Sequence, residues 1–359
     1  YNSGSAAVDV NNSVIIGQGA CGGGNISVDG TVSIGYNALD ALVSGAGNTA
    51  VGYLALLANN AAGSTVIGFE AGKTSTNGGN TLVGWKAGTL LLGGSDNTLV
   101  GYGAGDALAA SELRNIALGS NAMGALNEGG SGHADDNIAI GYDALKGASL
   151  HNNATTVSSN IAIGSYALDA TDTNAHTGTI AIGHQALTAC TAGNANTVIG
   201  YQAGDAILTG IRNTILGYQA GTNMGNAEAS NVAVGYLAMG AVDEGGSGGD
   251  ADGNIAIGED ALYGGDFSTN NRQLLGNVAI GYQALDGTAA NEHEGTIAIG
   301  YQALTGVVTG AGNTTVGYKS LNLLTTGAQN TIMGYEAGKD IRSGSSNNTA
   351  FGYAALGQT

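Results

Sequence analysis

The stretch NTVIGYQAGDAILTGIRNTILGYQAG, residues 196–221, contains nearly the same sequence motif twice, beginning at Asn196 and again at Asn213. Aligned on the glycine that follows the apolar pair, this motif recurs nineteen times in 359 residues, with successive motif glycines 16 to 23 residues apart. The motif glycines are Gly17, Gly35, Gly52, Gly68, Gly84, Gly101, Gly119, Gly141, Gly164, Gly183, Gly200, Gly217, Gly235, Gly258, Gly281, Gly300, Gly317, Gly334 and Gly352. This period is too short for a helical hairpin repeat, whose unit has about 33 residues or more.

Each position around the motif glycine has its own chemistry. The residue before the glycine is always large and apolar, the third before it is Ile, Val or Thr, and the fourth before it is usually Asn. Short β-rich runs between Gly and Asn turns predict an all-β fold, a parallel β-solenoid. We expect about 19 coils of 16–23 residues, each with room for two strands and two turns. The recurring Asn predicts a hydrogen-bonded ladder along the stack.

Alternation along a strand separates the residues one and three before the motif glycine from the residue between them. We expect the first pair, which includes the obligate large aliphatic residue, to fill the coil interior. The predicted core residues are Ile140, Ile163, Ile182, Ile257, Ile280 and Ile299.

The residue two before the motif glycine is never charged and is predicted to face outward. At about 4.8 Å per coil it would form an apolar stripe along a rod of roughly 90 Å, which is longer than a soluble monomer exposes. We therefore predict that identical stripes of neighbouring chains cover it. The predicted interface residues are Ala139, Ala162, Ala181, Ala256, Ala279 and Ala298.

A longer period is superimposed on the motif. AMGALNEGGSGHADDNIAIG, residues 122–141, matches AMGAVDEGGSGGDADGNIAIG, residues 238–258. We predict one continuous solenoid over residues 1–359, with six-coil super-repeats at about 101–217 and 217–334 and less regular coils in residues 1–100. The polar segments 129–136 and 245–253 lie in the longest coils. We expect them to bulge as loops and to carry partner contacts.

The motif copies NIAIGYDAL, residues 137–145, and NIAIGSYALDA, residues 160–170, resemble the head repeats of trimeric autotransporter adhesins. They are also similar to repeats in tail-fibre-like proteins of phages and bacteria. The resemblance covers all nineteen copies in the AIG core and is loose in spacing, because the adhesin heads have shorter coils. It implies a left-handed β-roll, three chains around one axis, and display outside the cell or on a virion.

Composition excludes several classes of partner. The formal net charge is −18, and the nine basic residues are scattered, so no basic stripe predicts nucleic-acid binding. No apolar run approaches the length that spans a membrane, so we expect no membrane insertion by this segment. The acids of the longest coils, Asp135, Asp136, Asp250 and Asp252, are weak calcium candidates, and solvated turn residues are the favoured interpretation.

No motif predicts catalysis, so we expect no enzyme activity and no cofactor.

An aromatic residue follows the motif glycine in fourteen copies. We interpret this column as a ladder that packs coil on coil, with carbohydrate stacking as the alternative. The threonines Thr49, Thr65, Thr81 and Thr98 suggest an ice-binding array, but they occupy a column assigned to the interior.

We therefore predict a structural and adhesive extracellular fibre segment, a homotrimer displayed at a cell surface or on a virion. Its partners would be copies of itself and a host-surface or matrix ligand. The alternatives are a phage or virion fibre shaft, an ice-binding solenoid and a fibre-borne polysaccharide-degrading enzyme. Outward threonine arrays would favour ice binding, and paired acids in a cleft on one coil would favour the enzyme.

Overall fold

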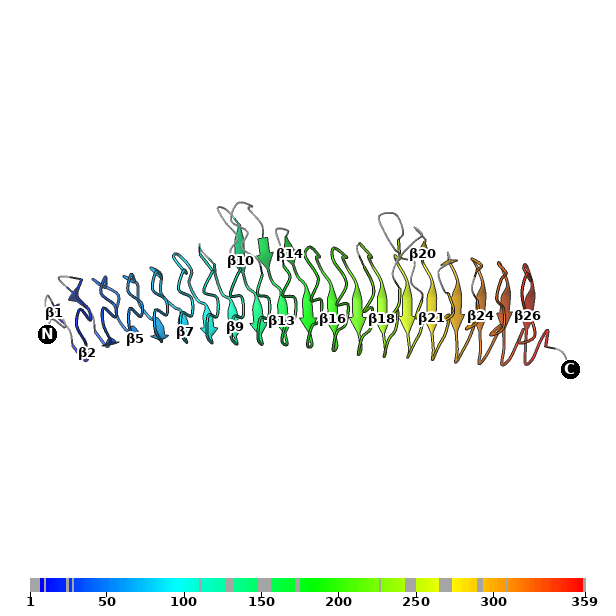
Figure 1. The fold of residues 1–359 in the computed structure, drawn as a ribbon, viewed down its shortest axis with the longest axis horizontal. Coiled ribbons are helices and arrows are strands. Elements are labelled where there is room, and N and C mark those ends of the chain that lie inside the picture. Colours follow the sequence, from blue (N-terminus) through cyan, green and yellow to red (C-terminus); the bar gives the residue numbers. More distant parts are fainter. Residues whose placement is uncertain are drawn as a thin grey trace. The chain divides into compact units, whose positions relative to one another are not determined.

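The computed structural model describes residues 7–9, 11–23, 26–27, 29–109, 112–126, 132–147, 156–171, 175–225, 227–242, 250–264, 273–288, 293–307 and 309–357. The chain divides into two compact units, residues 1–179 and 180–359. Each unit is a parallel β-solenoid, and the described residues contain no helix. Each motif glycine follows directly after a strand of three residues (Figure 1).

The first unit has one ladder of parallel strands, each in register with the next. Its strands are β2 (Val14–Ile16), β4 (Val32–Ile34), β5 (Thr49–Val51), β6 (Thr65–Ile67), β7 (Thr81–Val83), β8 (Thr98–Val100), β9 (Ile116–Leu118), β11 (Ile138–Ile140) and β13 (Ile161–Ile163).

The second unit repeats this arrangement. Its strands are β15 (Ile180–Ile182), β16 (Thr197–Ile199), β17 (Thr214–Leu216), β18 (Val232–Val234), β19 (Ile255–Ile257), β21 (Val278–Ile280), β23 (Ile297–Ile299), β24 (Thr314–Val316), β25 (Thr331–Met333) and β26 (Thr349–Phe351).

A second strand per coil was expected, and the described residues contain one in only a few coils. These strands are β1 (Ala7–Asp9), β3 (Ile26–Ser27), β10 (His133–Asp135), β12 (Thr156–Ser158), β14 (His176–Thr177), β20 (Leu274–Leu275) and β22 (His293–Glu294). In most coils the corresponding residues form bends or irregular backbone, with isolated bridges between Ser95 and Leu113 and between Thr309 and Thr326. The β12–β14 pair and the β20–β22 pair occupy equivalent places in the two predicted super-repeats. The segments 127–131 and 243–249, which include residues 129–131 and 245–249 of the predicted loops, lie outside the described residues.

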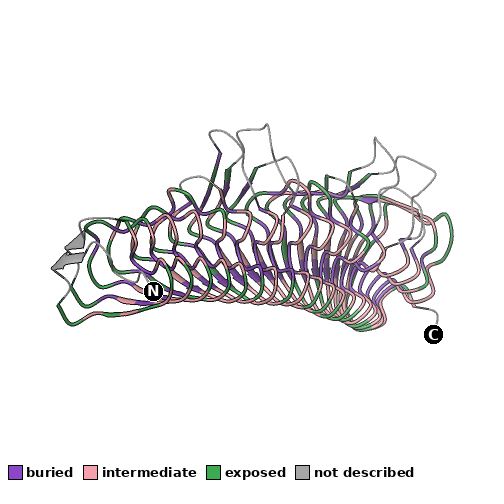
Figure 2. Ribbon diagram, turned by 60° about the vertical axis from the view of Figure 1, so that its left-hand side comes forward, coloured by how far each residue is buried: buried purple, intermediate pink, exposed green. Residues whose placement is uncertain are grey.

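The structure reverses the predicted inside and outside of the coil. The middle residue of each strand that precedes a motif glycine, rather than the first and last, fills the interior, except for the partly exposed Ile15 of β2 (Figure 2). The predicted interface residues Ala139, Ala162, Ala181, Ala256, Ala279 and Ala298 are fully buried within their own chain. The predicted core residues Ile140, Ile163, Ile182, Ile257, Ile280 and Ile299 are all partly exposed, Ile257 by 39%. Both assignments are therefore wrong.

The narrow interior explains this reversal. The middle strand residue shares it with the fourth residue after the motif glycine, and the two volumes compensate each other. Where the middle residue is Ala139, the fourth residue is Leu145, and both are fully buried. Where it is Leu99, the fourth residue is Gly105, and a Cβ added to Gly105 would lie 2.8 Å from Leu99 Cδ1. One large side chain at these two positions fills the space that they share, and two would overpack it.

The motif glycine is required by backbone geometry and by the next coil. Gly200 has a φ of +148°, and a Cβ there would lie 2.0 Å from the backbone oxygen of Gly217. Such φ values are nearly exclusive to glycine, and a contact with backbone atoms cannot be relieved by moving a side chain. The same contact recurs at most other motif glycines. The glycine corner therefore sets how closely successive coils approach.

The predicted asparagine ladder is confirmed. The backbone N–H and the Nδ2 of Asn115 both donate to Oδ1 of Asn97, at 2.9 and 3.1 Å. Its Nδ2 also donates to the backbone oxygen of Ala134, at 2.6 Å. The buried amide thus contacts Asn97 of the preceding coil and the backbone three residues before Asn137, the equivalent asparagine of the following coil. Because these polar groups are paired, their burial carries no large desolvation penalty.

Because the two side-chain volumes compensate, substitutions at these two positions of one coil should have strongly coupled effects on the free energy of unfolding. Ala181→Val alone should destabilise by about 1–3 kcal/mol through overpacking, and Leu187→Gly alone by about 2–5 kcal/mol through a cavity. Together they convert this coil to the Val198 and Gly204 pattern of the next coil. The double variant should therefore be more stable than the sum of the two losses by about 0.5–3 kcal/mol. Denaturant unfolding measures each value.

Ala181→Val combined with Leu285→Gly serves as the matched control. These two residues lie in different coils of the second unit, so their effects should add. If the stability losses were additive in both double variants, residues 181 and 187 would not share one interior space.

Candidate functional surface

The outer face of the sheet is uncharged in both units, with an apolar residue at the last position of each ladder strand and Thr, Val or Ile at the first. It consists of the first and last residue of each strand that precedes a motif glycine, and none of these residues is charged. Ile16 is 57% exposed, Leu216 is 46% exposed and Phe351 is 63% exposed. The predicted stripe, the residue two before each motif glycine, is therefore wrong, and the outer face is formed by the strand residues that had been assigned to the core.

The aromatic residues after the motif glycines form stacked ladders. In the first unit the rings of Tyr36, Tyr53, Phe69, Trp85 and Tyr102 follow one another with centroids 4.5 to 6.2 Å apart and planes 6° to 12° from parallel. This confirms the predicted packing ladder. Each inner ring has neighbours on both faces, so the ladder offers ring edges rather than ring faces to a ligand.

The ladders of the second unit have the same spacing. Tyr201, Tyr218 and Tyr236 stack in one run, and His184 lies at its start, tilted by 31° against Tyr201. A second run follows from Tyr282 to Tyr353. The rings are still partly exposed at the surface.

The threonine array faces outward, contrary to the prediction. Thr49, Thr65, Thr81 and Thr98 are the first residues of β5 to β8 and pair with one another in register. Each side chain is partly or largely exposed. The reason for setting ice binding aside, that this column points inward, is therefore wrong.

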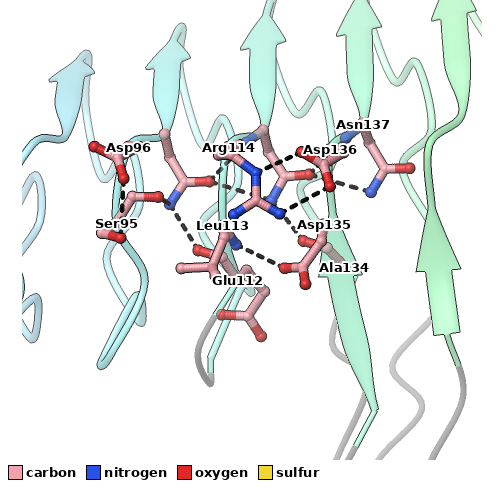
Figure 3. A network of polar contacts seen from close by, with 11 residues as sticks. Ser95, Asp96, Glu112, Leu113, Arg114, Ala134, Asp135, Asp136 and Asn137 are labelled. Atoms are coloured by element: carbon pink, nitrogen blue, oxygen red, sulfur yellow. Dashed lines mark hydrogen bonds and ion pairs between the residues drawn. The ribbon is translucent and has the colours of Figure 1, made fainter.

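The calcium candidates make contacts between coils instead of gathering at one point. Asp135 accepts a hydrogen bond of 2.8 Å from the backbone N–H of Leu113, and Asp136 pairs with Arg114 through two hydrogen bonds of 2.6 and 2.9 Å (Figure 3). This pairing lowers the pKa of the Asp136 carboxyl. Both carboxylates therefore already have partners within the chain.

The second pair of candidates shows the same arrangement. Asp252 accepts a hydrogen bond of 2.6 Å from the backbone N–H of Ala229, and Asp250 is exposed and forms an isolated bridge with Gln273. Within the described ranges no group of three or more His, Cys, Asp or Glu side chains could hold a metal ion. These acids act as turn and ladder residues where the structure shows them.

Histidines and cysteines are dispersed through the described coils. His176 and His293 are buried at equivalent positions in β14 and β22, whereas His133 is exposed. Cys21 and Cys190 are buried free thiols, and burial raises the pKa of the Cys190 thiol to about 12. A thiol with so high a pKa is a poor nucleophile.

In the part of the chain that the structure covers, no helix has the length and apolar character needed to cross a bilayer.

Two half-buried aspartates have strongly raised pKa values that the sequence did not suggest. Burial raises the pKa of Asp169 to about 6, with further repulsion from Asp143. Burial also raises the pKa of Asp286 to about 6, with further repulsion from Asp260. Both residues are the fifth after a motif glycine, on the wall that follows the aromatic column. They form acidic spots that are partly protonated near neutral pH.

These pKa values predict the direction of a pH effect on stability. The folded-state pKa lies above the unfolded value of about 3.9, so the folded state binds the proton more tightly. Protonation of these two aspartates therefore adds to the free energy of unfolding. This contribution is absent above pH 6 and grows as the pH falls towards 4. The Asp169→Asn and Asp286→Asn double variant should melt higher than the parent at pH 7.5, and the difference should shrink at pH 4.5. Thermal melts at both pH values measure this, and a difference that grows on acidification would contradict it.

No family model, curated protein or solved structure matches this chain. The likeness to adhesin head repeats and fibre repeats therefore remains a resemblance of motifs.

Proposed function

We propose that this chain is a structural and adhesive segment of an extracellular fibre, in which identical copies associate through the outer face of the sheet. The observation that carries this proposal is the uncharged outer face, with Ile16, Leu216 and Phe351 each exposed by more than 45%. Contiguous apolar surface of this kind marks association sites in soluble proteins. A second copy of the chain has the complementary chemistry, because its own outer face is equally uncharged and has the same apolar residues at the strand ends.

Three copies around one axis are the arrangement we favour, and the motif resemblance supports both this number and a left-handed coil. Parallel in-register copies would bring like coils together, so that the nineteen motif copies meet their equivalents. The charges lie away from the outer face, and a formal net charge of −18 would keep assembled fibres soluble and apart. Display at a cell surface or on a virion, with polar loops contacting a host or matrix ligand, completes the proposal.

Assembly should be abolished by charges on the outer face. Leu216→Asp combined with Ile257→Asp places two carboxylates on residues that are 46% and 39% exposed. A folded single chain should tolerate them, whereas an assembled face would bury unpaired charge at a high cost. Sedimentation equilibrium should show a trimer for the parent and a monomer for this variant, with unchanged circular dichroism.

Ser230→Asp combined with Gln329→Asp is the matched control. Both residues are exposed, have positive φ, and occupy the same turn of their coils away from the outer face. This variant should remain a trimer. A monomeric parent chain, or a trimeric Leu216 and Ile257 variant, would refute the proposed assembly.

The outward threonines favour ice binding as a second candidate function. Thr49, Thr65, Thr81 and Thr98 alternate with buried residues and are followed on the same face by Val or Ile. Hydroxyl and methyl groups are thus presented in a regular two-dimensional array, with strands about 4.8 Å apart. Such an array can order water in a lattice-like pattern. This function requires the outer face to be free, so it excludes the proposed trimer.

The ice-binding candidate predicts a monomer that produces thermal hysteresis. Thr65→Lys combined with Thr81→Lys should abolish the hysteresis, because two long cations would disrupt the array. Thr76→Lys combined with Thr325→Lys, which alters exposed threonines outside the strands, should leave it unchanged. An assembled parent chain, or a monomer without hysteresis in nanolitre osmometry, would eliminate this candidate.

A further inference from the structure

The aromatic ladder of the first unit is interrupted after Tyr102. The next residue in the aromatic column is Ser120, and Tyr142 follows it in the coil after that. The backbone N–H of Asn121 donates to the oxygen of Tyr102 at 2.8 Å. The backbone N–H of Asp143 donates to the oxygen of Ser120 at 3.1 Å. The three coils are therefore in register, and two aromatic residues flank one short serine side chain.

Tyr102 has one ring face that no other ring covers. On one side it stacks on Trp85, with centroids 4.5 Å apart and planes 6° from parallel. Tyr53 and Trp85 have rings on both sides and are 44% and 39% exposed, whereas Tyr102 is 55% exposed. This larger exposure is expected for a ring that lacks one neighbour. The kind of surface that the inner rings of the ladder hide is thus accessible beside Ser120.

Tyr142 bounds the interruption on its other side. It is 45% exposed and meets Tyr166 of the following coil edge to face, with centroids 5.3 Å apart and planes at 78°. Among the described residues no ring lies against Tyr142 on the side of Ser120. Tyr102, Ser120 and Tyr142 are together called the Ser120 step.

The distance across the Ser120 step selects the thickness of a guest. Neighbouring coils lie about 4.8 Å apart, so two coil steps separate the rings of Tyr102 and Tyr142 by about 9.6 Å. A flat ring that contacts both would need them only about 7–8 Å apart, because carbon atoms pack best at about 3.5–4.0 Å. A saturated six-membered ring is thicker, since axial C–H bonds project from both of its sides. The spacing therefore favours a saturated ring.

Two polar atoms lie beside the ring faces. The Ser120 side chain is partly exposed, and its hydroxyl makes no hydrogen bond to any described residue. The Nδ2 of Asn121 donates to Asp143 at 3.1 Å, which leaves the Oδ1 of Asn121 able to accept. A Cβ added to Gly103, the residue after Tyr102, would lie 3.0 Å from this Oδ1. The step thus offers a hydroxyl and an amide oxygen to the hydroxyl groups of a ligand.

The charges around the Ser120 step are balanced and favour a neutral ligand. Lys146 pairs with Asp143 at 2.9 Å, and Asp143 is only 4% exposed. Asp106 also lies near Gly103, where burial raises the pKa of its carboxyl and the charge of Lys86 opposes this shift. Two acids and two lysines therefore surround the step. A quaternary ammonium group is also thick and is attracted by aromatic rings, but no exposed, unpaired carboxylate is present here to select it.

We propose that the Ser120 step binds one pyranose ring of a neutral polysaccharide with equatorial hydroxyl groups, such as a β-glucan of the cellulose type. The C–H faces of the sugar lie against Tyr102 and Tyr142, and its hydroxyls bond with the Ser120 hydroxyl and the Oδ1 of Asn121. Equatorial hydroxyls leave C–H bonds on both faces of the ring, as two aromatic neighbours require. The proposal rests on the adhesive function above, for which it names the ligand class, but the binding itself requires only the first unit.

The interruption of the ladder in the second unit differs from the Ser120 step. There Glu259 stands in the aromatic column between Tyr236 and Tyr282. Tyr236 is 48% exposed, but Tyr282 is less exposed than either ring of the Ser120 step. The longer, charged side chain of Glu259 replaces the small serine. This place therefore provides a matched control rather than a second sugar site.

Titration of the full chain with cellotriose, followed by calorimetry and by ligand-observed NMR, tests the proposal. Mannotriose, which has an axial hydroxyl on each ring, tests the need for two C–H faces. Choline is the cationic probe and indole is the flat aromatic probe. Cellotriose should bind, and each of the other three probes should bind at least about tenfold more weakly.

Two pairs of variants locate the binding. Ser120→Tyr places a ring in the step and should abolish cellotriose binding, whereas Glu259→Tyr, its matched control, should leave binding unchanged. Tyr102→Leu removes one wall and should weaken binding at least tenfold. Tyr53→Leu removes an inner ring of the same ladder and should leave binding unchanged. Circular dichroism checks that each variant is folded.

Three results would overturn the proposal: no binding of cellotriose, undiminished binding by the folded Ser120→Tyr or Tyr102→Leu variant, or equal binding of any other probe. These results are independent of assembly. Loss of sugar binding in a chain that still forms trimers would leave the proposed fibre intact. Sugar binding at the Ser120 step by a chain that sediments as a monomer would leave the site assignment intact and remove the trimer.

Discussion

The contact between successive glycine corners is the constraint on which the rest of the structure depends. At Gly200 a Cβ would lie 2.0 Å from the backbone oxygen of Gly217, so the chain can turn there only with a hydrogen in place of a side chain. Once this approach is set, strands of three residues align in register, aromatic rings stack at about 5 Å, as between Tyr282 and Tyr301, and buried asparagines reach one another. The side-chain ladders are consequences of this backbone spacing.

Much of the fold could be predicted because a repeat displays each structural requirement many times. The strands, the glycine corners, the asparagine ladder and the aromatic ladder all follow from residue types at fixed places. Which strand residues point into the coil could not be predicted from alternation alone, since neither face of the strand carries a charge. The pairing of Leu99 with Gly105, and of Ala139 with Leu145, contained the missing information. Volumes that compensate must share one space, so this covariation within the chain identifies the interior.

The surface chemistry was less predictable, for two different physical reasons. The roles of Asp135 and Asp136 depend on which backbone N–H and which arginine the next coil brings near, and composition alone does not reveal such partners. The raised pKa values of Asp169 and Asp286 depend on burial, which follows only from the coil geometry.

Most coils of each unit belong to one of two interchangeable types. One carries Ala in the strand and Leu or Met after the corner, and the other carries Val, Leu or Ile in the strand and Gly after the corner. Both produce the same backbone and the same spacing, so a coil of either type fits against its neighbours. Unequal recombination between copies of the gene segment could therefore add or remove whole coils without creating a packing defect. The length of such a protein can change in evolution by steps of one coil, while substitutions on the outer positions diversify its surface independently.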